Sequence, residues 1–286
     1  GRHGITLIFF LGSVFSPYYA RARRRVGDGG DPLDHCAVNV ALYGAPRRWA
    51  MTERPRDALA RSVDTLAIGP SSLRWTGTML EARVDEVTAP VPGRVRGTVR
   101  VQPRALTGHS EQLDAVGEHR WSPIAPSARV EVDLTHPRLT WRGEGYFDTN
   151  AGIVPLEHSF ARWTWARAPL ADGTAVLYDV TRRDGSDLAL ALRIGRDGSV
   201  TRESSPPAAT LPTGAWRMGR ATRADGGQAA RLVETLEDTP FYTRSVIDTH
   251  LFGERVTGMH DSLCLDRFQR GWVQTLVPFR NPRRFW

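Results

Sequence analysis

The sequence predicts an antiparallel all-β fold, and three features lead to this prediction. Short runs of alternating apolar and polar residues dominate the chain, and Gly, Pro and Asp turns separate them. Val130, Val132 and Leu134 illustrate the alternation, because residues two apart lie on one face of a strand. Helical periodicity is scarce, and the chain has neither a βαβ pattern nor a Gly-rich phosphate loop. These features favour a sandwich or a barrel and argue against a nucleotide cofactor.

Individual strands and turns follow from the same pattern. The run from Leu188 to Ile194 alternates as a strand should, and Asp197-Gly198 after it favours a tight hairpin. Asp184-Gly185 gives a similar turn signal before that run. The apolar stretch from Ile5 to Phe15 is about half as long as a membrane-spanning helix, so we interpret it as a buried strand. It also lacks the cleavage pattern of a signal peptide.

Length and composition are those of a globular protein with about two domains. The 286 residues are 41% hydrophobic and 24% charged, as in ordinary soluble proteins. We place the boundary in the stretch Gly145 to Gly152, near the middle of the chain. This assigns residues 1–148 to an N-terminal domain and residues 149–286 to a C-terminal domain. Residues 204–209 are expected to form a loop inside the second half.

The net charge of +7 does not by itself indicate a nucleic-acid-binding protein. All 38 basic residues are Arg, as the codon bias of a GC-rich genome would produce, so we expect an ordinary basic surface and no nucleic-acid partner. Weak attraction to anionic lipid is compatible with this charge. The two cysteines, Cys36 and Cys264, lack metal-ligand spacing, which argues against a zinc site or a disulfide framework and favours a reducing, cytoplasmic compartment.

Two short motifs carry residue types that are suited to catalysis. His119-Arg120-Trp121 and Tyr146-Phe147-Asp148 each place two such side chains at positions i and i+2, which share one face of a strand. If both strands line one cavity, they supply a carboxylic acid, an imidazole and two aromatic faces. Each motif alone arises often by chance.

Other polar clusters give weaker signals. Asp34-His35-Cys36 and Met259-His260-Asp261-Ser262 contain nucleophile-like neighbours, but no GxSxG elbow is present, which argues against a hydrolytic triad. Trp163 and Trp165 alternate on an expected strand and are suited to stacking on a sugar or a polyene. Alternating aromatic residues more often belong to a core, so this segment is only supporting evidence.

Six segments, in this order along the chain, resemble the carotenoid 1,2-hydratase family, also called hydroxyneurosporene synthases. They are Gly12–Tyr19 (GSVFSPYY), Asp34–Gly44 (DHCAVNVALYG), Trp49–Arg54 (WAMTER), Ile68–Leu73 (IGPSSL), His119–Pro123 (HRWSP) and Gly145–Asn150 (GYFDTN). The resemblance covers essentially the whole chain. The family has a further aromatic-rich segment before the position of Gly1, so we expect the start of this chain to be truncated.

The resemblance implies both a fold and an activity. The fold is two lipocalin-like β domains, with a broader relation to AttH proteins and to cyclising enzymes on the same scaffold. The activity is hydration of the 1,2 double bond of acyclic carotenes, such as neurosporene and lycopene, to tertiary 1-hydroxy carotenoids. The family's functional positions fall on His119, Trp121, Tyr146 and Asp148.

The implied reaction needs a strong acid in a dry environment, because water does not attack an unactivated alkene. We assign Asp148 as this acid, since burial beside Trp121 and Tyr146 would keep a proton on it near neutral pH. His119 is expected to orient Asp148 or to take the proton from water. The aromatic faces of Trp121 and Tyr146 are expected to stabilise the developing cation. We expect no cofactor.

A carotene is too apolar to be free in water, so the resemblance also predicts peripheral contact with a membrane. The expected location is the cytoplasmic side of the inner or intracytoplasmic membrane. Candidates for the contact are the apolar strand Ile5 to Phe10 and the basic loop Arg21 to Arg25.

Two other functions stay open at this point. A lipocalin-like carrier would hold a carotenoid or another lipid without transforming it. A different enzyme on the same scaffold is the second alternative, such as a cyclase or a glycosidase with paired carboxylates. Glu144 and Asp179 are candidate partners for Asp148 in the glycosidase.

Overall fold

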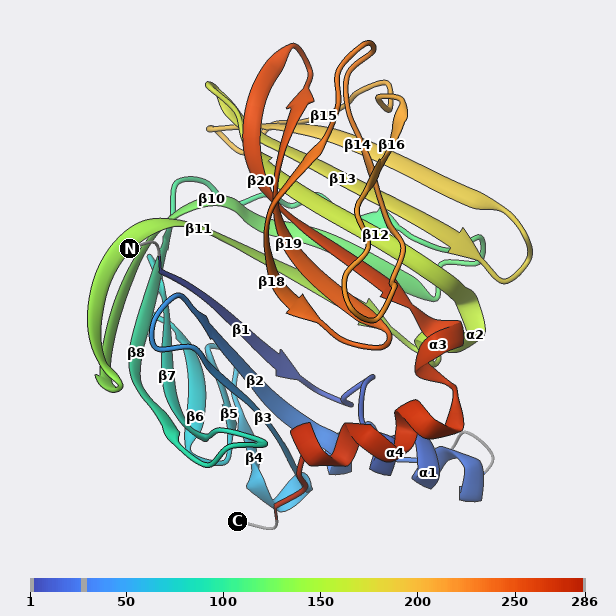
Figure 1. Cartoon of the computed structure of the whole chain (residues 1–286). Coiled ribbons are helices and arrows are strands. Elements are labelled where there is room, and N and C mark those ends of the chain that lie inside the picture. Colours follow the sequence, from blue (N-terminus) through green and yellow to red (C-terminus); the bar gives the residue numbers. More distant parts are fainter. Residues whose placement is uncertain (1–2, 27–29, 285–286) are drawn as a thin grey trace. The chain divides into compact units, whose positions relative to one another are not determined.

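The structure, a computed structural model, describes residues 3–26 and 30–284 and consists mainly of strands (Figure 1). Strands account for 56% and helices for 12% of the protein, and the sheets are antiparallel, which confirms the predicted all-β class. The chain forms two compact units. Unit 1 comprises Gly1–Gln102, Arg129–Gly145 and Gln274–Trp286, and unit 2 comprises Pro103–Ala128 and Tyr146–Val273.

Two sheets supply the framework of unit 1. One has the strand order β1-β2-β3, and the other has the order β11-β10-β8-β7-β6-β5-β4, with β9 also paired to β10. Strand β9 and the last residue of β8 belong to unit 2, and β10 and β11 contribute residues to both units. The strands are β1 (Gly4–Phe10), β2 (Cys36–Tyr43), β3 (Arg48–Arg54), β4 (Leu59–Arg61), β5 (Thr65–Ile68), β6 (Ser71–Trp75), β7 (Leu80–Val87), β8 (Arg94–Pro103), β9 (Glu111–Gln112), β10 (His119–His136) and β11 (Arg138–Gly152).

Alternating side chains from both sheets form the core of unit 1. Val38 and Val40 on β2 pack in one cluster with Val132 and Leu134 on β10, and all four are almost completely buried. This is the face that the alternation of residues 130–134 predicts. Gly97 on β8 has φ of 152°, and a Cβ there would lie 2.3 Å from the carbonyl oxygen of Asp133, so glycine permits the close approach of these backbones.

Unit 2 is built around one long sheet. Its strand order is β15-β14-β13-β12-β20-β19-β18, and β16 and β17 form a separate pair. The strands are β12 (Phe160–Pro169), β13 (Gly173–Arg182), β14 (Asp187–Gly195), β15 (Val200–Arg202), β16 (Ala208–Leu211), β17 (Arg220–Arg223), β18 (Arg231–Asp238), β19 (Tyr242–Leu251) and β20 (Glu254–Cys264). The predicted hairpin turns are confirmed, with Gly185 between β13 and β14 and Gly198 between β14 and β15, at φ of 87° and 86°.

Helices are short and few in the part of the chain that the structure describes. They are α1 (Pro17–Val26), α2 (Leu156–Ser159), α3 (Leu265–Phe268) and α4 (Gly271–Arg280), with 3-10 turns η1 (Pro32–His35) and η2 (Arg56–Ala58). Among the described residues, no helix is long and apolar enough to cross a membrane.

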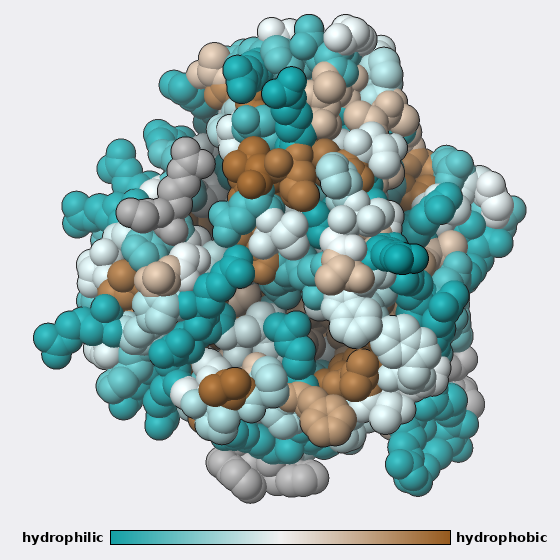
Figure 2. Space-filling model, viewed as in Figure 1, coloured by the Kyte–Doolittle hydropathy of each residue, from teal (hydrophilic) through white to brown (hydrophobic). Residues whose placement is uncertain are grey.

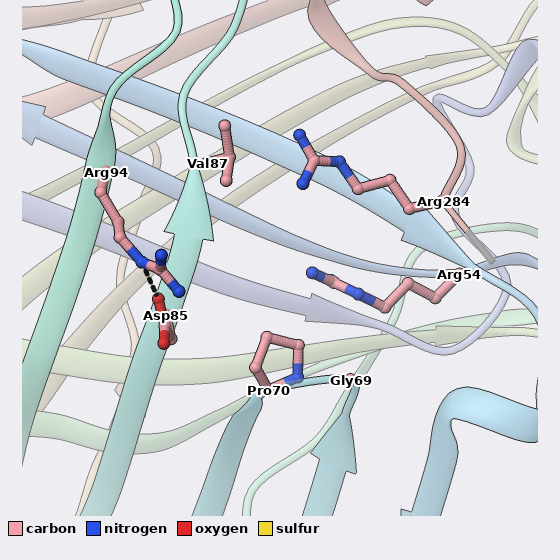
Figure 3. Close-up of a pocket in the computed structure, with 7 residues that line it drawn as sticks. All are labelled: Arg54, Gly69, Pro70, Asp85, Val87, Arg94 and Arg284. Carbon is pink, nitrogen blue, oxygen red and sulfur yellow. Dashed lines mark hydrogen bonds and ion pairs between the residues drawn. The ribbon is translucent and has the colours of Figure 1, made fainter. Parts of the chain in front are cut away.

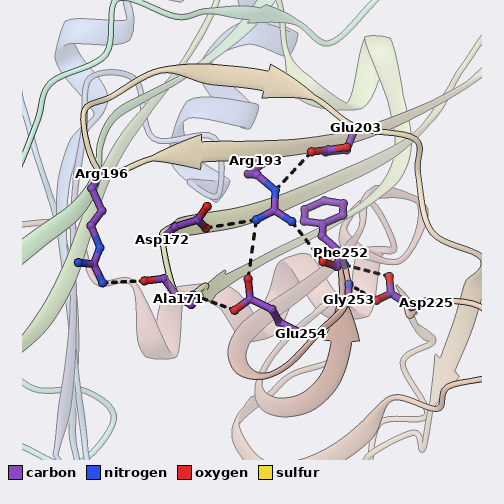
Figure 4. Close-up of polar contacts among 9 residues, drawn as sticks. All are labelled: Ala171, Asp172, Arg193, Arg196, Glu203, Asp225, Phe252, Gly253 and Glu254. Carbon is purple, nitrogen blue, oxygen red and sulfur yellow. Dashed lines mark hydrogen bonds and ion pairs between the residues drawn. The ribbon is translucent and has the colours of Figure 1, made fainter.

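An arginine network fixes one end of the unit 2 sheet (Figure 4). Arg193 on β14 forms ion pairs with Asp172, Glu203 and Glu254, and its guanidinium also donates to the carbonyl oxygen of Phe252. These partners come from the β12–β13 turn, the segment after β15, the start of β20 and the β19–β20 turn. These contacts hold the turns together, so Arg193 has a structural role and we assign it no catalytic one.

Three local predictions need correction. Arg21 to Arg25, expected to be a loop, lie in helix α1. Pro17 at the first helical position and the high helix propensity of Arg favour this helix over a loop. The stretch Gly145 to Gly152, expected to interrupt the strands, is part of β11. The apolar stretch from Ile5 to Phe15 forms a strand only as far as Phe10, and β1 is half-buried because it is an edge strand.

The domain boundary predicted between residues 148 and 149 stays a prediction. The chain passes between the compact units at several points, and the one nearest to this boundary lies between Gly145 and Tyr146. The loop predicted at residues 204–209 is confirmed for residues 204–207, and it is wrong for residues 208–209, which begin β16 because they pair with β17.

Candidate active site

The two sequence motifs meet in unit 2, where β10 and β11 run side by side. His119 and Trp121 on β10 are buried, and Arg120 between them is exposed, as expected for a strand with one inward face. Tyr146 and Asp148 on β11 are half-buried. A hydrogen bond joins Trp121 to Asp148, so the structure brings these two motifs together.

Two donors hold the Asp148 carboxylate through one oxygen. The Trp121 Nε1–H donates to Asp148 Oδ2 at 2.7 Å, and the Tyr146 hydroxyl donates to the same oxygen at 3.1 Å. Within the described residues, no hydrogen bond reaches Asp148 Oδ1. A proton on this carboxyl group therefore belongs on Oδ1, because both donors already point at Oδ2.

The surroundings of Asp148 favour its protonated form. Burial raises the pKa of Asp148, and the hydrogen bonds from Trp121 and Tyr146 offset part of that increase. Asp261 raises this pKa further, whereas Arg244 lowers it. These two residues form a buried ion pair, with Arg244 Nε and Nη2 at 2.8 and 2.6 Å from the Asp261 oxygens. Their opposite charges therefore offset one another at Asp148, and desolvation decides the direction.

A series of contacting aromatic rings adjoins the carboxyl group, and Trp121, Tyr178 and Phe160 among them are buried. The centroid distances are 5.6 Å for Trp121–Tyr178, 6.1 Å for Tyr178–Trp163, 6.0 Å for Trp163–Phe160, 4.8 Å for Phe160–His119 and 5.4 Å for Tyr146–Trp165. Burial raises the pKa of Tyr146 well above its usual value, so its hydroxyl stays a donor to Asp148 at neutral pH. The electron-rich faces of such rings attract a cation and provide an apolar surface for a polyene.

His119 lies in the cluster but makes no hydrogen bond to Asp148 within the described residues. Its ring packs against Phe160, and its buried Nε2 has no hydrogen-bond partner among those residues. Burial lowers the pKa of His119, so the ring is neutral near pH 7 and one ring nitrogen is a free base. The predicted role of His119 as acceptor of the water proton fits this state and stays a prediction.

Gly152 on β11 sets the position of His119. A Cβ at residue 152 would lie 2.3 Å from His119 Nδ1 and 2.7 Å from Cε1, so Gly152→Ala must push the imidazole away. We expect this substitution to lower kcat by about tenfold to a hundredfold and to leave the pKa of Asp148 unchanged, because it does not touch the carboxylate. The measurement is steady-state turnover. The control is Gly143→Ala on the same strand, where the new Cβ would have no atom within 4 Å. Wild-type turnover of Gly152→Ala would show that the imidazole position is unimportant.

The other polar clusters found in the sequence have structural partners. His35 Nδ1 lies 2.7 Å from Glu53 Oε1, and His260 Nε2 bonds to the carbonyl oxygen of Ala221 at 2.8 Å. Asp179, a candidate second carboxylate, is held by the guanidinium of Arg223 at 2.7 to 2.9 Å. These contacts give no nucleophile and base within reach of one another.

Sequence reasoning missed three members of the cluster. Arg244 and Asp261 face each other across β19 and β20, and Tyr178 on β13 donates to Asn150 Oδ1 at 3.3 Å. The fragment His260-Asp261 was visible as a polar cluster, but its pairing with Arg244 depends on strand register. Pairing over that distance leaves no local signal in the sequence.

A pocket in unit 1 does not offer this chemistry (Figure 3). Its volume is about 350 Å³, and it is lined by Arg54, Gly69, Pro70, Asp85, Val87, Arg94 and Arg284. Its carboxylate, Asp85, is paired with Arg94, and both terminal nitrogens of Arg54 are bound by Glu86. No acid in this lining is placed to protonate an alkene, so we assign the site to the Asp148 cluster.

Comparison with known proteins agrees with the resemblance found in the sequence. The family described as "Carotenoid hydratase CrtC" matches residues 7–286. The chain belongs to the carotenoid hydratase family. It is therefore a hydratase, a lyase that adds water to a carbon–carbon double bond.

Relatives within this family are similar over almost the whole chain. Proteins named acyclic carotenoid 1,2-hydratase share 54% identity in Thiocapsa roseopersicina and 49% in Rubrivivax gelatinosus, each over 99% of this chain and 70% of the relative. The protein of the same name from Cereibacter sphaeroides shares 43% identity over 97% of this chain and 98% of its own.

Solved structures support the fold alone. A putative AttH from Nitrosomonas europaea aligns with a TM-score of 0.57 at 14% identity, covering 80% of each chain. CghA, crystallised with Sch210972, aligns with a TM-score of 0.51 at 13% identity, covering 80% of this chain and 79% of its own. The predicted lipocalin-like, AttH-related fold of the carotenoid hydratase family is thereby confirmed.

Proposed function

We propose that the chain adds water across the 1,2 double bond of an acyclic carotene and forms a tertiary 1-hydroxy carotenoid. The observation that carries this proposal is the half-buried Asp148, whose pKa is raised and whose Oδ1 is left open by the two donors on Oδ2. A hydratase of an unactivated alkene needs such a carboxylic acid. The family relatives named acyclic carotenoid 1,2-hydratase give the substrate class.

The first step transfers a proton from Asp148 Oδ1 to C2 of the carotene. The π electrons of the 1,2 bond form the new C2–H bond, and the positive charge appears on the tertiary carbon C1. Trp121 and Tyr146 keep their hydrogen bonds to Oδ2, and these bonds stabilise the carboxylate as it forms. The acid therefore loses its proton without being left as an unpaired buried charge.

The second step is the capture of the cation by water. The faces of Trp121 and Tyr146 stabilise the cation, at about 2 kcal/mol or more per desolvated contact. A water oxygen bonds to C1, and its surplus proton either returns directly to Asp148 or passes first to the neutral His119 and then from the imidazolium to Asp148, which restores both groups. The reaction balances with substrate and water alone, and we propose that it needs no cofactor.

We also propose that the protein works at a membrane surface as a peripheral protein, on the cytoplasmic side of the inner or intracytoplasmic membrane. Acyclic carotenes are hydrocarbons, so the substrate reaches the enzyme from a bilayer. The net charge of +7 supports attraction to anionic lipid.

An isotope experiment tests the proposed reaction directly. The protein is incubated anaerobically with lycopene or neurosporene in detergent and H₂¹⁸O, and the products are analysed by mass spectrometry. We expect a tertiary alcohol that carries ¹⁸O, formed without added cofactor. Bound but unchanged carotene would instead identify a carrier, and the absence of both binding and product would indicate a different enzyme on this scaffold.

A further inference from the structure

Helix α4 presents an apolar stripe to solvent. Trp272, Leu276 and Phe279 are 47%, 44% and 68% exposed. Their spacing of four and three residues places them on one face of the helix. A surface helix ordinarily turns polar residues outward, so α4 has the opposite arrangement. We call these three residues the α4 stripe.

Contacts on other faces hold α4 in this orientation. Val273 is buried, and the guanidinium of Arg280 lies 3.9 Å from the ring centroid of Trp49. Directly after the helix, the backbone of residues 282–284 bonds to Glu53 on β3, through Pro282 O and Arg284 N. The C-terminal half of α4 is thus fixed to unit 1, and the stripe is not a frayed end.

The surroundings of the α4 stripe are basic. Residues 269–286 contain Arg270, Arg280, Arg283 and Arg284 and no acidic residue, and of these Arg283 is ion-paired with Glu53 on β3. The residues over α4 in the space-filling view are brown and pale, and teal side chains border them (Figure 2). An apolar stripe beside arginines complements the interface of a bilayer that contains anionic lipid.

Helix α1 adds to this basic surface within unit 1. Tyr19 on α1 stacks on His35 at 4.8 Å between centroids, and Arg283 Nη1 lies 2.8 Å from His35 Nδ1. The chain that leaves α4 is therefore linked to α1 through one histidine. Helix α1 has no acidic residue, and its Arg21, Arg24 and Arg25 are exposed.

We infer that the α4 stripe docks on the surface of an anionic lipid bilayer, with aromatic and leucine side chains in the headgroup region and arginines against lipid phosphates. A second protein molecule fits less well, because a stable protein interface buries roughly 800 Å² per partner. One helical face of ten residues with three large apolar side chains is smaller than that, whereas interfacial helices bind lipid with such a face and adjacent basic residues. The choice of a bilayer also rests on the proposed function, because its substrate is a membrane hydrocarbon.

Vesicle flotation with the full chain tests this inference. Vesicles of phosphatidylcholine alone are compared with vesicles that contain phosphatidylglycerol, at low and high salt. We expect binding to the anionic vesicles, weakened by salt, and a loss of affinity of about tenfold or more in Leu276→Ser/Phe279→Ser. The matched control is Val63→Ser/Val91→Ser, which removes two side chains that are 108% and 76% exposed elsewhere in unit 1, and it should bind like the wild type.

Each outcome decides the inference. Equal vesicle binding by the stripe variant and the wild type would overturn it. A wild-type dimer in light scattering that the stripe variant converts to a monomer would also overturn it, since the stripe would then be an interface between copies. Flotation measures vesicle binding and not turnover, so the inference about the α4 stripe can hold even if the proposed reaction is wrong. If the reaction holds, the stripe variant should lose turnover of vesicle-embedded carotene and retain turnover of carotene in detergent.

Discussion

Replacing Asp148 by Asn is expected to abolish hydration while the protein stays folded. Asn keeps an oxygen that accepts from Trp121 Nε1 and Tyr146 Oη, so the hydrogen bonds on that side are preserved. It has no acidic proton to give to C2 of the alkene. Loss of a general acid in a reaction that begins with protonation predicts a decrease in kcat of about a thousandfold or more. Product analysis with ¹⁸O-labelled water gives the required sensitivity.

Thermal unfolding separates loss of the acid from loss of the fold. The folded-state pKa of Asp148 is raised, so the folded protein holds this proton to higher pH than the unfolded chain does. The stability linked to this proton is complete below the unfolded pKa and is lost as pH rises through the folded pKa. A neutral Asn escapes that loss, and Asp148→Asn should melt at or above the wild-type temperature at pH 7. Asp187→Asn, an exposed change on β14, is the control and should keep full activity. Appreciable turnover by a folded Asp148→Asn protein would remove Asp148 from the role of acid.

The sequence predicts the part of the fold that local alternation determines. Val132 and Leu134 point into the core as their spacing predicts, and Asp-Gly turns place Gly185 and Gly198 at positive φ. Segments whose structure depends on distant partners were predicted less well. Gly152 resembles a loop residue by type, yet it stays in β11, where its missing side chain makes room for His119.

The candidate site, too, is predicted only in part from the sequence. The i, i+2 spacing predicts that His119 and Trp121 share one face of a strand and that Tyr146 and Asp148 share one face of another. The family resemblance then identifies these four residues as the functional ones. Neither reveals that Trp121 Nε1 and the Tyr146 hydroxyl converge on a single oxygen of Asp148, because that depends on the register between β10 and β11. The outward stripe on α4 was also missed, since an apolar helical face ordinarily predicts burial.

The pH dependence of turnover is the second large effect that the site predicts. Asp148 must be protonated to act, so kcat should fall about tenfold per pH unit above its raised pKa. Tyr146→Phe removes a hydrogen bond that stabilises the carboxylate, so the pKa of Asp148 should rise further. We expect the descending limb of the profile to move upward by about one pH unit. The profile is measured with carotene in detergent, so that vesicle binding does not contribute.

A second tyrosine in the cluster, Tyr178, provides the control for this shift in the pH profile. Tyr178 also packs against Trp121, but its hydroxyl donates to Asn150 and not to Asp148. Tyr178→Phe should therefore leave the midpoint of the descending limb in place, whatever it does to the maximal rate. A downward shift in Tyr146→Phe, or equal shifts in both variants, would mean that the Tyr146 hydroxyl does not stabilise the Asp148 carboxylate. The upward shift in Tyr146→Phe alone would place the titrating acid at Asp148, because that hydroxyl touches no other carboxylate among the described residues.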